Sequence, residues 1–134
     1  MTNVYVSGVF DLFHEGHVNF LREASSYGRL IVGIHDDQFA TQYKRRPAVP
    51  EKSRYAVVKS CRYVSEVIEG VGLLSTQLLE AYQIGLVLHG NDFSPQTAEK
   101  YFQPAISRGI FQFINYTYHI SSSQILASIE NRLK

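Results

Sequence analysis

The chain has no tryptophan, a single cysteine and no long apolar run. One cysteine excludes an internal disulfide framework, and no N-terminal apolar segment of the signal or transmembrane type is present, so we expect a cytoplasmic protein. Thirteen basic and twelve acidic residues nearly cancel. No overall field therefore attracts the chain to nucleic acid or to a membrane, and we expect neither as a partner. Any affinity for phosphate must be local.

The 134 residues predict one domain, 1–134, long enough to bury about two-thirds of the surface that its unfolded form exposes. Apolar runs alternate with helical patterns along it, which is typical of a doubly wound α/β fold with a mainly parallel sheet. The five expected strands lie near residues 3–8, 29–34, 65–69, 86–90 and 110–116. The expected helices cover residues 16–27, 37–43, 50–62, 75–82 and 95–108, with a helical tail after residue 121.

Polar residues follow directly after the first expected strand. The strand breaks at Gly8, and Asp11, His14 and His17 precede a helical pattern that we expect to end at Gly28. A helix start carries free N–H groups and the positive end of the helix dipole, so two imidazoles beside it favour a bound phosphate. The sequence therefore predicts an anion site here.

The run G-V-F-D-L-F-H-E-G-H resembles the H-x-G-H motif of the nucleotidyltransferase superfamily. It has the G-x-F-D-x-x-H-x-G-H form that is shared by cytidylyltransferases acting on phosphorylated alcohols. This resemblance implies a Rossmann-like sheet of order 3-2-1-4-5. It also implies that His14 and His17 are catalytic, and that the nucleotide is bound by Gly8, Val9, Phe10 and Asp11. We expect Asp11 to fix the loop or a metal-bound water.

Three basic residues, Lys44, Arg45 and Arg46, precede Pro47 and should form a loop, because proline pushes its predecessor toward extended geometry. Taken alone, such a run is a solvated surface loop. In the resembled family a lysine about ten positions before the arginine of the next helix reaches the triphosphate, and Lys44 stands in that relation to Arg54. The resemblance thus implies a catalytic Lys44 and a nucleotide-binding Arg54, with Arg45 and Arg46 as candidate contacts for the second substrate or a phosphate.

The segment R-Y-A-V-V-K-S-C-R-Y-V-S-E-V is similar to the R-Y-x-x-V-x-x-C-R-Y-V-D-E-V segment of choline- and ethanolamine-phosphate cytidylyltransferases. In that family the segment supports the nucleotide pocket and a dimer interface, so the resemblance implies a homodimer. Ser65 stands where an aspartate is usual. Cys61 falls in the helical pattern and is expected to be a small core residue.

Two further blocks carry the resemblance. H-G-N-D is similar to the H-G-x-D segment, which implies that Gly90 and Asp92 line the base and ribose side, although Asn91-Asp92 also fits an ordinary turn. Ser121 and Gln124 fit a capping box. That block is also similar to R-T-x-G-I-S-T-T, which implies phosphate binding by Ile120, Ser121, Ser122 and Ser123.

The last block departs from its family at two positions. Tyr116 stands in place of the arginine and His119 in place of the glycine. A phenol cannot supply the charged, bidentate fork of a guanidinium. Either Arg45, Arg46 or Arg54 compensates, or the second substrate is held differently. Tyr116 and His119 themselves remain candidate contacts for that substrate or for a phosphate.

These observations predict a cytidylyltransferase that combines CTP with a phosphorylated small alcohol to give a CDP-alcohol and pyrophosphate. We expect Mg²⁺ to enter with the triphosphate, and we assign no metal ligands. Two alternatives stay open: the same chemistry with ATP, and a nucleotide-binding domain that has lost turnover, suggested by Tyr116 and His119. Glycerol, ethanolamine, choline and sugar phosphates are all candidate acceptors. The lack of tryptophan slightly disfavours choline, because a quaternary ammonium favours an aromatic cage.

Overall fold

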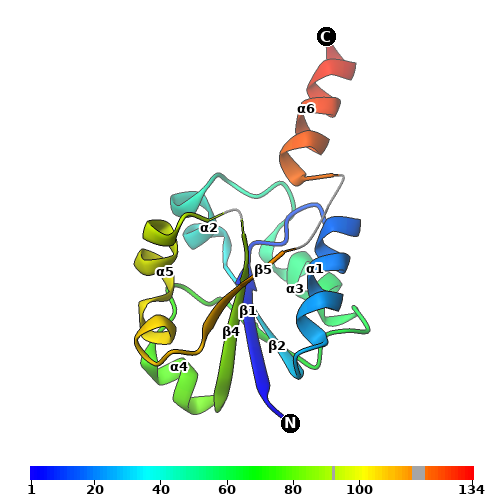
Figure 1. Cartoon of the computed structure of the whole chain (residues 1–134). Helices are drawn as coiled ribbons and strands as arrows, with labels where there is room; N and C mark the ends of the chain where they lie inside the picture. Colours follow the sequence, from blue (N-terminus) through cyan, green and yellow to red (C-terminus); the bar gives the residue numbers. More distant parts are fainter. Residues whose placement is uncertain (92, 116–119) are drawn as a thin grey trace.

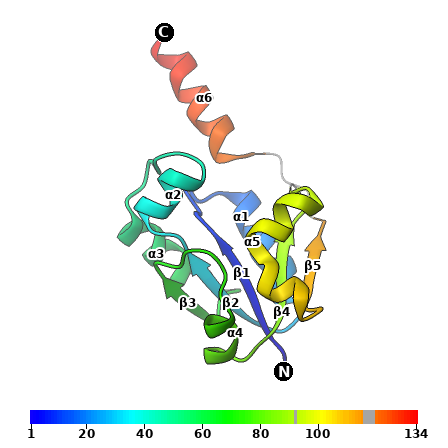
Figure 2. The same ribbon diagram turned by 90° about the vertical axis from the view of Figure 1, so that its left-hand side faces the viewer.

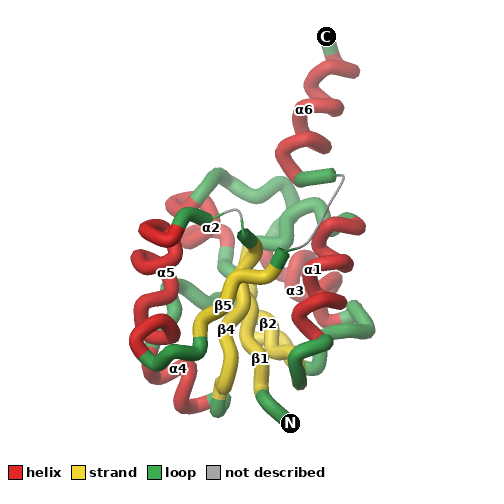
Figure 3. Tube along the Cα trace, viewed as in Figure 1, coloured by secondary structure: helices red, strands yellow, loops and turns green. Residues whose placement is uncertain are grey.

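A computed structural model of the chain describes residues 1–91, 93–115 and 120–134. Five strands form one sheet in the order β3-β2-β1-β4-β5, and every neighbouring pair is parallel. The expected fold class and strand order are therefore confirmed (Figures 1 and 3). The strands are β1 (Asn3–Gly8), β2 (Arg29–Ile34), β3 (Glu66–Glu69), β4 (Ile84–Gly90) and β5 (Phe111–Ile114).

Helices cover both faces of the sheet. One face packs against α1 (Glu15–Ser25) and α3 (Glu51–Lys59), and the other against α4 (Thr76–Ala81) and α5 (Pro95–Ser107), as Figure 1 shows. Each face of the sheet carries its own hydrophobic core. Successive side chains of the central strand β1 pack into one core and then the other, because side chains alternate along a strand. Val4 and Val6 pack with the first pair of helices and Tyr5 with the second.

Two helices lie at the carboxyl-end side of the sheet. α2 (Asp37–Tyr43) is capped by Asp36, whose carboxylate accepts a hydrogen bond from the backbone N–H of Phe39. α6 (Ser122–Leu133) points away from the rest of the molecule in both ribbon views (Figures 1 and 2). Among the described residues no helix is both long and apolar enough to cross a membrane.

A bend in α5 lies close to Pro104, which is inside the helix. The backbone of Phe102 is non-helical, with φ −126° and ψ 22°, two residues before the proline. Proline lacks the N–H that would bond to the carbonyl one turn back, and its ring crowds that carbonyl. The bend still leaves Phe102 and Ala105 in the core.

Two predicted boundaries are wrong. α3 ends at Lys59 with Ser60 as its cap, so Cys61 and Arg62 lie beyond the helix. Cys61 keeps an apolar contact with the core after the helix has ended, which explains the misleading pattern. Gly85 does not end α4 but lies inside β4, and the turn between them contains Gln83 with φ 51°.

Gly28 does not form the expected left-handed cap. α1 ends at Ser25 with Ser26 as its cap, and Gly28 follows with φ 159°. A Cβ at Gly28 would lie 2.2 Å from the Thr2 carbonyl oxygen. The glycine is therefore required by the close approach of the N-terminal backbone where the chain enters β2.

Candidate functional site

A cavity of about 230 Å³ lies at the carboxyl ends of β1 and β4. The strand order reverses between these two strands, which is where open α/β sheets bind ligands. The cavity is lined by most of the residues that the sequence singles out. These are Gly8, Val9, Phe10, Asp11, His14, His17, Lys44, Arg45, Gly90, Ser121, Ser122 and Ser123.

His14 and His17 form a reciprocal cap at the start of α1. Nδ1 of His14 accepts a hydrogen bond from the Gly16 N–H at 3.0 Å, and Nδ1 of His17 accepts one from the His14 N–H at 3.1 Å. Because each Nδ1 accepts, the proton of each neutral ring sits on Nε2. The two rings, 4.0 Å apart between centroids, therefore offer two Nε2–H donors at the cavity.

Both imidazoles are held neutral. Burial, and then the charge of His14, lower the pKa of His17 to about 3. Burial also lowers the pKa of His14. At neutral pH both rings can donate hydrogen bonds to an anion while carrying no charge themselves. Positive potential comes instead from the start of α1 and from Lys44, which lines the same cavity.

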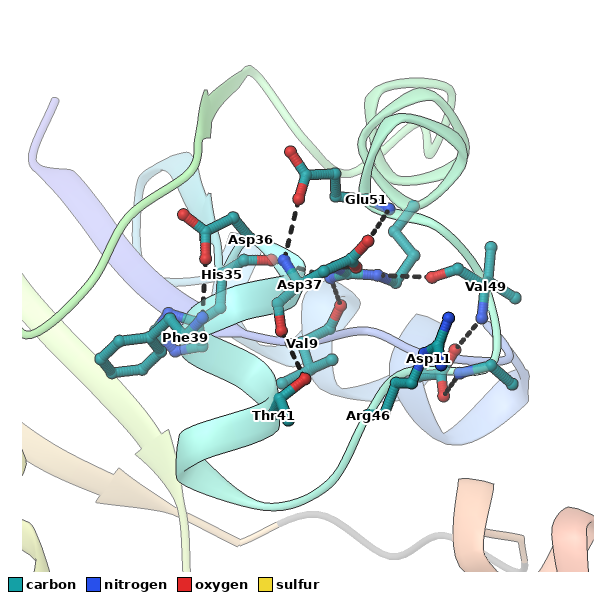
Figure 4. A network of polar contacts seen from close by, with 12 residues as sticks. Val9, Asp11, His35, Asp36, Asp37, Phe39, Thr41, Arg46, Val49 and Glu51 are labelled. Carbon is teal, nitrogen blue, oxygen red and sulfur yellow. Dashed lines mark hydrogen bonds and ion pairs between the residues drawn. The ribbon is translucent and has the colours of Figure 1, made fainter.

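Asp11 holds the basic loop in place. Its buried carboxylate accepts hydrogen bonds from Arg45 Nη1 and the Ala48 N–H, both at 2.8 Å, and from the Val49 N–H at 2.9 Å. Figure 4 shows Asp11 facing Val49. Burial alone would raise the pKa of Asp11, but these hydrogen bonds outweigh it and lower the pKa below its usual value. The carboxylate is thus charged, and it positions the loop that carries Lys44.

Arg54 is buried and makes structural contacts that the sequence does not reveal. Its guanidinium donates to the carbonyls of Val9, His35 and Val49 at 2.7 to 2.9 Å and pairs with the Asp37 carboxylate at 2.6 Å. The side chain is 1% exposed, and Arg54 is not among the residues that line the cavity. It joins the loops after β1 and β2 to the start of α3, which is a positioning role, and its expected nucleotide contact stays a prediction.

The other expected residues are placed as follows. Arg46 and Ile120 do not line the cavity. The carbonyl of Arg46 accepts a hydrogen bond from Arg45. Asp92, Tyr116 and His119 lie outside the described residues, so their expected contacts remain predictions.

The start of α6 forms the opposite wall of the cavity. The Ser121 hydroxyl accepts from the Gln124 N–H at 3.1 Å, and the Gln124 side chain accepts from the Ser121 N–H at 2.9 Å, which confirms the capping box. The Ser122 hydroxyl donates to the backbone carbonyl of Asp11. Two helix starts, those of α1 and α6, therefore meet at one cavity, an arrangement suited to a chain of phosphates.

A second, smaller cavity of about 70 Å³ adjoins the first, and we call it the side cavity. The two share the walls formed by Ser7, Gly8, Val9, Lys44 and His89. The side cavity is otherwise largely aromatic, and sequence reasoning missed it. The spacing of Phe39 and Tyr43 on one face of α2 was an available signal. The other rings that line the side cavity include those of His35, Tyr101 and Phe102.

A protein family described as cytidylyltransferase-like has a sequence model that matches residues 5–128 of this chain. The ethanolamine-phosphate cytidylyltransferase of Arabidopsis thaliana is 39% identical over 135 residues. The probable ethanolamine-phosphate cytidylyltransferase of Encephalitozoon cuniculi is 35% identical over 126 residues, and choline-phosphate cytidylyltransferase A of Rattus norvegicus is 32% identical over 131. These matches take in 92% to 94% of this chain but only 32% to 39% of the relatives' own length.

Solved structures share the fold. The lipopolysaccharide core biosynthesis protein from Thermoplasma volcanium superimposes with a TM-score of 0.72 at 24% identity, covering 90% of this chain and 99% of that one. Pantothenate synthetase from Thermus thermophilus gives 0.64 at 12% identity, covering 99% of this chain and 64% of its own. The matched family model spans nearly all of the chain, from β1 into α6. The chain therefore belongs to the cytidylyltransferase-like family.

Proposed function

We propose that this chain transfers CMP from CTP to a phosphorylated small alcohol, giving a CDP-alcohol and pyrophosphate. One observation carries the proposal: two neutral imidazole donors, His14 and His17, Lys44 and two helix starts line a single cavity. This set of donors suits the three phosphates of a nucleotide better than a single phosphate group. Relatives named ethanolamine- and choline-phosphate cytidylyltransferases support the nucleotide and the acceptor class.

In the proposed reaction, a phosphate oxygen of the acceptor attacks the α-phosphorus of CTP in line. The bond from that phosphorus to the bridging oxygen of the β-phosphate breaks, and its electron pair leaves with pyrophosphate. The nucleophile is already an anion, so no side chain has to remove a proton. The protein contributes position and charge stabilisation: His14 and His17 donate through Nε2–H, and Lys44 adds a positive charge where negative charge develops.

We also propose Mg²⁺ as the companion of the triphosphate. Within the described ranges no cluster of three or more His, Cys, Asp or Glu side chains gathers to hold a metal ion. Magnesium commonly enters such sites held by the phosphates, with few protein ligands. This fits a cavity whose described walls supply donors and cations. The ion would neutralise part of the charge on the departing pyrophosphate.

Pyrophosphate release tests the reaction. The parent protein is incubated with Mg²⁺, with CTP or ATP, and with a panel of ethanolamine, choline, glycerol and sugar phosphates. We expect turnover with CTP. His17→Ala should lower the rate by about 10² to 10³, the size seen when one oxyanion donor is removed. Glu15→Gln is the matched control, because Glu15 is exposed in the same helical turn and does not line the cavity.

Other results of this assay would identify one of the two alternative functions. Turnover with ATP in place of CTP would identify an adenylyltransferase. Nucleotide binding without turnover on any acceptor would identify a binding module, and the departures at Tyr116 and His119 would then be its cause. Equal rates of pyrophosphate release for His17→Ala and Glu15→Gln would contradict a catalytic role of the His17 imidazole.

We further propose that the chain forms a homodimer through the segment from Arg54 to Ile68. The resemblance of this segment to the family's dimer block is the support, and Arg62 is exposed with its guanidinium 5.0 Å from the Tyr63 ring centroid. Light scattering after gel filtration measures the mass directly. A monomer of 15.2 kDa at micromolar concentration would contradict the proposal.

A further inference from the structure

The side cavity is placed to receive the second substrate. It shares Ser7, Gly8, Val9, Lys44 and His89 with the larger cavity, so an acceptor phosphate at that shared wall would direct its alcohol tail into the side cavity. The chemistry of the side cavity should then decide which alcohol is accepted. This role of the side cavity rests on the proposed function.

His35, at the carboxyl end of β2, supplies a hydrogen-bond acceptor to the side cavity. The residue is 6% exposed, and its Nδ1 lies 2.8 Å from the Val71 carbonyl oxygen. A carbonyl can only accept, so Nδ1 carries the proton and Nε2 of the neutral ring is left with a bare lone pair. Burial lowers the pKa of His35, which keeps the ring in this form at neutral pH.

Nε2 of His35 has no hydrogen-bond partner within residues 1–91, 93–115 and 120–134. His35 lines the side cavity, so a ligand that covers its Nε2 without bringing a donor would leave that acceptor buried and unpaired, which is costly. The two nitrogens point in nearly opposite directions from the ring, and Val71 takes one of them. The free nitrogen therefore lies on the side of the ring away from Val71.

The rings around His35 favour a positive group. The His35 ring centroid lies 4.4 Å from that of Phe39 and 5.8 Å from that of Tyr43, and Tyr43 lies 5.1 Å from Tyr101. The faces of such rings attract cations. Lys44 already illustrates this, with Nζ 5.4 Å from the Tyr43 centroid. A small organic cation at the end of the acceptor would thus lie among aromatic rings and beside one bare nitrogen, with Lys44 at the wall next to the phosphate.

We propose that His35 is a specificity-determining residue that accepts, at Nε2, a hydrogen bond from the protonated primary amine of a phosphorylated amino alcohol. A trimethylated amine has no N–H to donate and would leave the imidazole nitrogen buried and unpaired. A hydroxyl could donate, but it gains less from the aromatic faces. The side cavity therefore selects ethanolamine phosphate over choline phosphate and glycerol phosphate.

Two substitutions separate this role from a merely structural one. In His35→Asn the amide can still donate to the Val71 carbonyl from the place of Nδ1, but nothing occupies the place of Nε2. In His35→Gln the longer side chain can put its carbonyl oxygen near that place. Each variant is compared with the parent by kcat/KM for ethanolamine phosphate and for choline phosphate, with CTP saturating.

We expect the parent to favour ethanolamine phosphate. His35→Asn should lose roughly tenfold or more in kcat/KM for ethanolamine phosphate, the size of a lost hydrogen bond to a charged group, and about twofold or less for choline phosphate. His35→Gln should recover most of the loss. An equal fall for both acceptors in His35→Asn, or a parent that prefers choline phosphate, would overturn the proposal.

A binding measurement keeps this test separate from the test of the reaction. If the parent shows no turnover with any acceptor, the proposed function fails, but nitrogen NMR of ¹⁵N-histidine protein still reports on His35. Ethanolamine phosphate, added with CTP, should move the Nε2 signal away from the position of an unprotonated nitrogen, and choline phosphate should not. The same shift with both, or with neither, counts against the role of His35.

Discussion

The helices α1 and α6 both begin at the larger cavity with a reciprocal cap, yet they are held in different ways. α1 buries Gly16, Phe20, Leu21 and Ala24 against the sheet. α6 has no buried residue, and it extends away from the body of the protein (Figure 2). One wall of the cavity is thus fixed by the core, whereas the other depends on its own cap and on the bond from Ser122 to Asp11.

The comparison separates two ways of building a phosphate site. On the α1 side, burial fixes the helix and also keeps His14 and His17 neutral, so stability and chemistry depend on the same packing. On the α6 side, hydroxyls and backbone N–H groups supply the donors without any titratable group. Substitutions should therefore affect the two walls by different amounts and through different measurements.

Leu21→Ala tests the core support of α1 and should have the largest effect on stability. Leu21 is fully buried, so its truncation removes buried apolar surface and leaves a cavity, at a cost of about 2 to 5 kcal/mol. Urea unfolding measures it. Ile129→Ala in α6, where Ile129 is 47% exposed, is the matched control and should stay within about 0.5 kcal/mol. Equal losses would show that α6 is packed in solution.

Asp11→Asn tests the anchor of the basic loop at the cavity. The amide cannot accept hydrogen bonds with both of its polar atoms, so the donors of Arg45, Ala48 and Val49 are not all satisfied, and we expect a loss of about 1.5 to 3 kcal/mol. Activity should fall as well, because the loop that carries Lys44 loses its anchor. Asp36→Asn is the control, since asparagine is an equally good helix cap. A larger loss in the control would contradict the role of Asp11.

Acid should lower the stability of the protein through His17, in the first turn of α1. The pKa of His17 is about 3 in the folded protein and near 6.5 in the unfolded chain, so only the unfolded chain takes up a proton between these values. The free energy of unfolding should therefore fall as pH falls below 6.5, by up to about 1.4 kcal/mol per pH unit for this group. Urea titrations at pH 7, 6 and 5 measure the slope. His17→Asn should flatten it, and an unchanged slope would mean that other groups cause it.

Ser122→Ala should have the smallest effect on stability, and this effect should be limited to α6. Removing the hydroxyl deletes one hydrogen bond to the Asp11 carbonyl, worth about 0.5 to 1.5 kcal/mol. Hydrogen exchange should become faster in the first turns of α6 and stay unchanged in α1. Ser123→Ala is the control, because no side-chain hydrogen bond of Ser123 is found among the described residues. Faster exchange in both helices would show that α6 supports α1.

The sequence predicts the elements that depend on local patterns. The apolar runs at Val4–Val6 and Leu30–Ile34 identify central strands because both faces of the sheet are covered. Asp36 and Ser121 identify helix starts because a cap needs only a side-chain oxygen and an N–H two or three residues later. The order of the strands, in contrast, came from the resemblance to a family.

Long-range contacts are what the sequence could not supply. Asp11 meets Ala48 and Val49, 37 and 38 positions away, and nothing near Asp11 in the sequence specifies those partners. Arg54 looks like a charged helix residue, yet it is buried against three carbonyls from separate loops. His35 seemed only to precede a helix cap, because its partner Val71 lies 36 positions further on.

The contact between Ser122 and Asp11 also bears on the order in which the protein folds. It joins residues 111 positions apart, and closing so long a loop in an unfolded chain opposes the gain from one hydrogen bond. Pairing of β1, β4 and β5 brings the two ends near each other first. We therefore expect the cavity to be completed late, when the sheet has already formed, so that a chain arrested before this step would have its fold without a finished cavity.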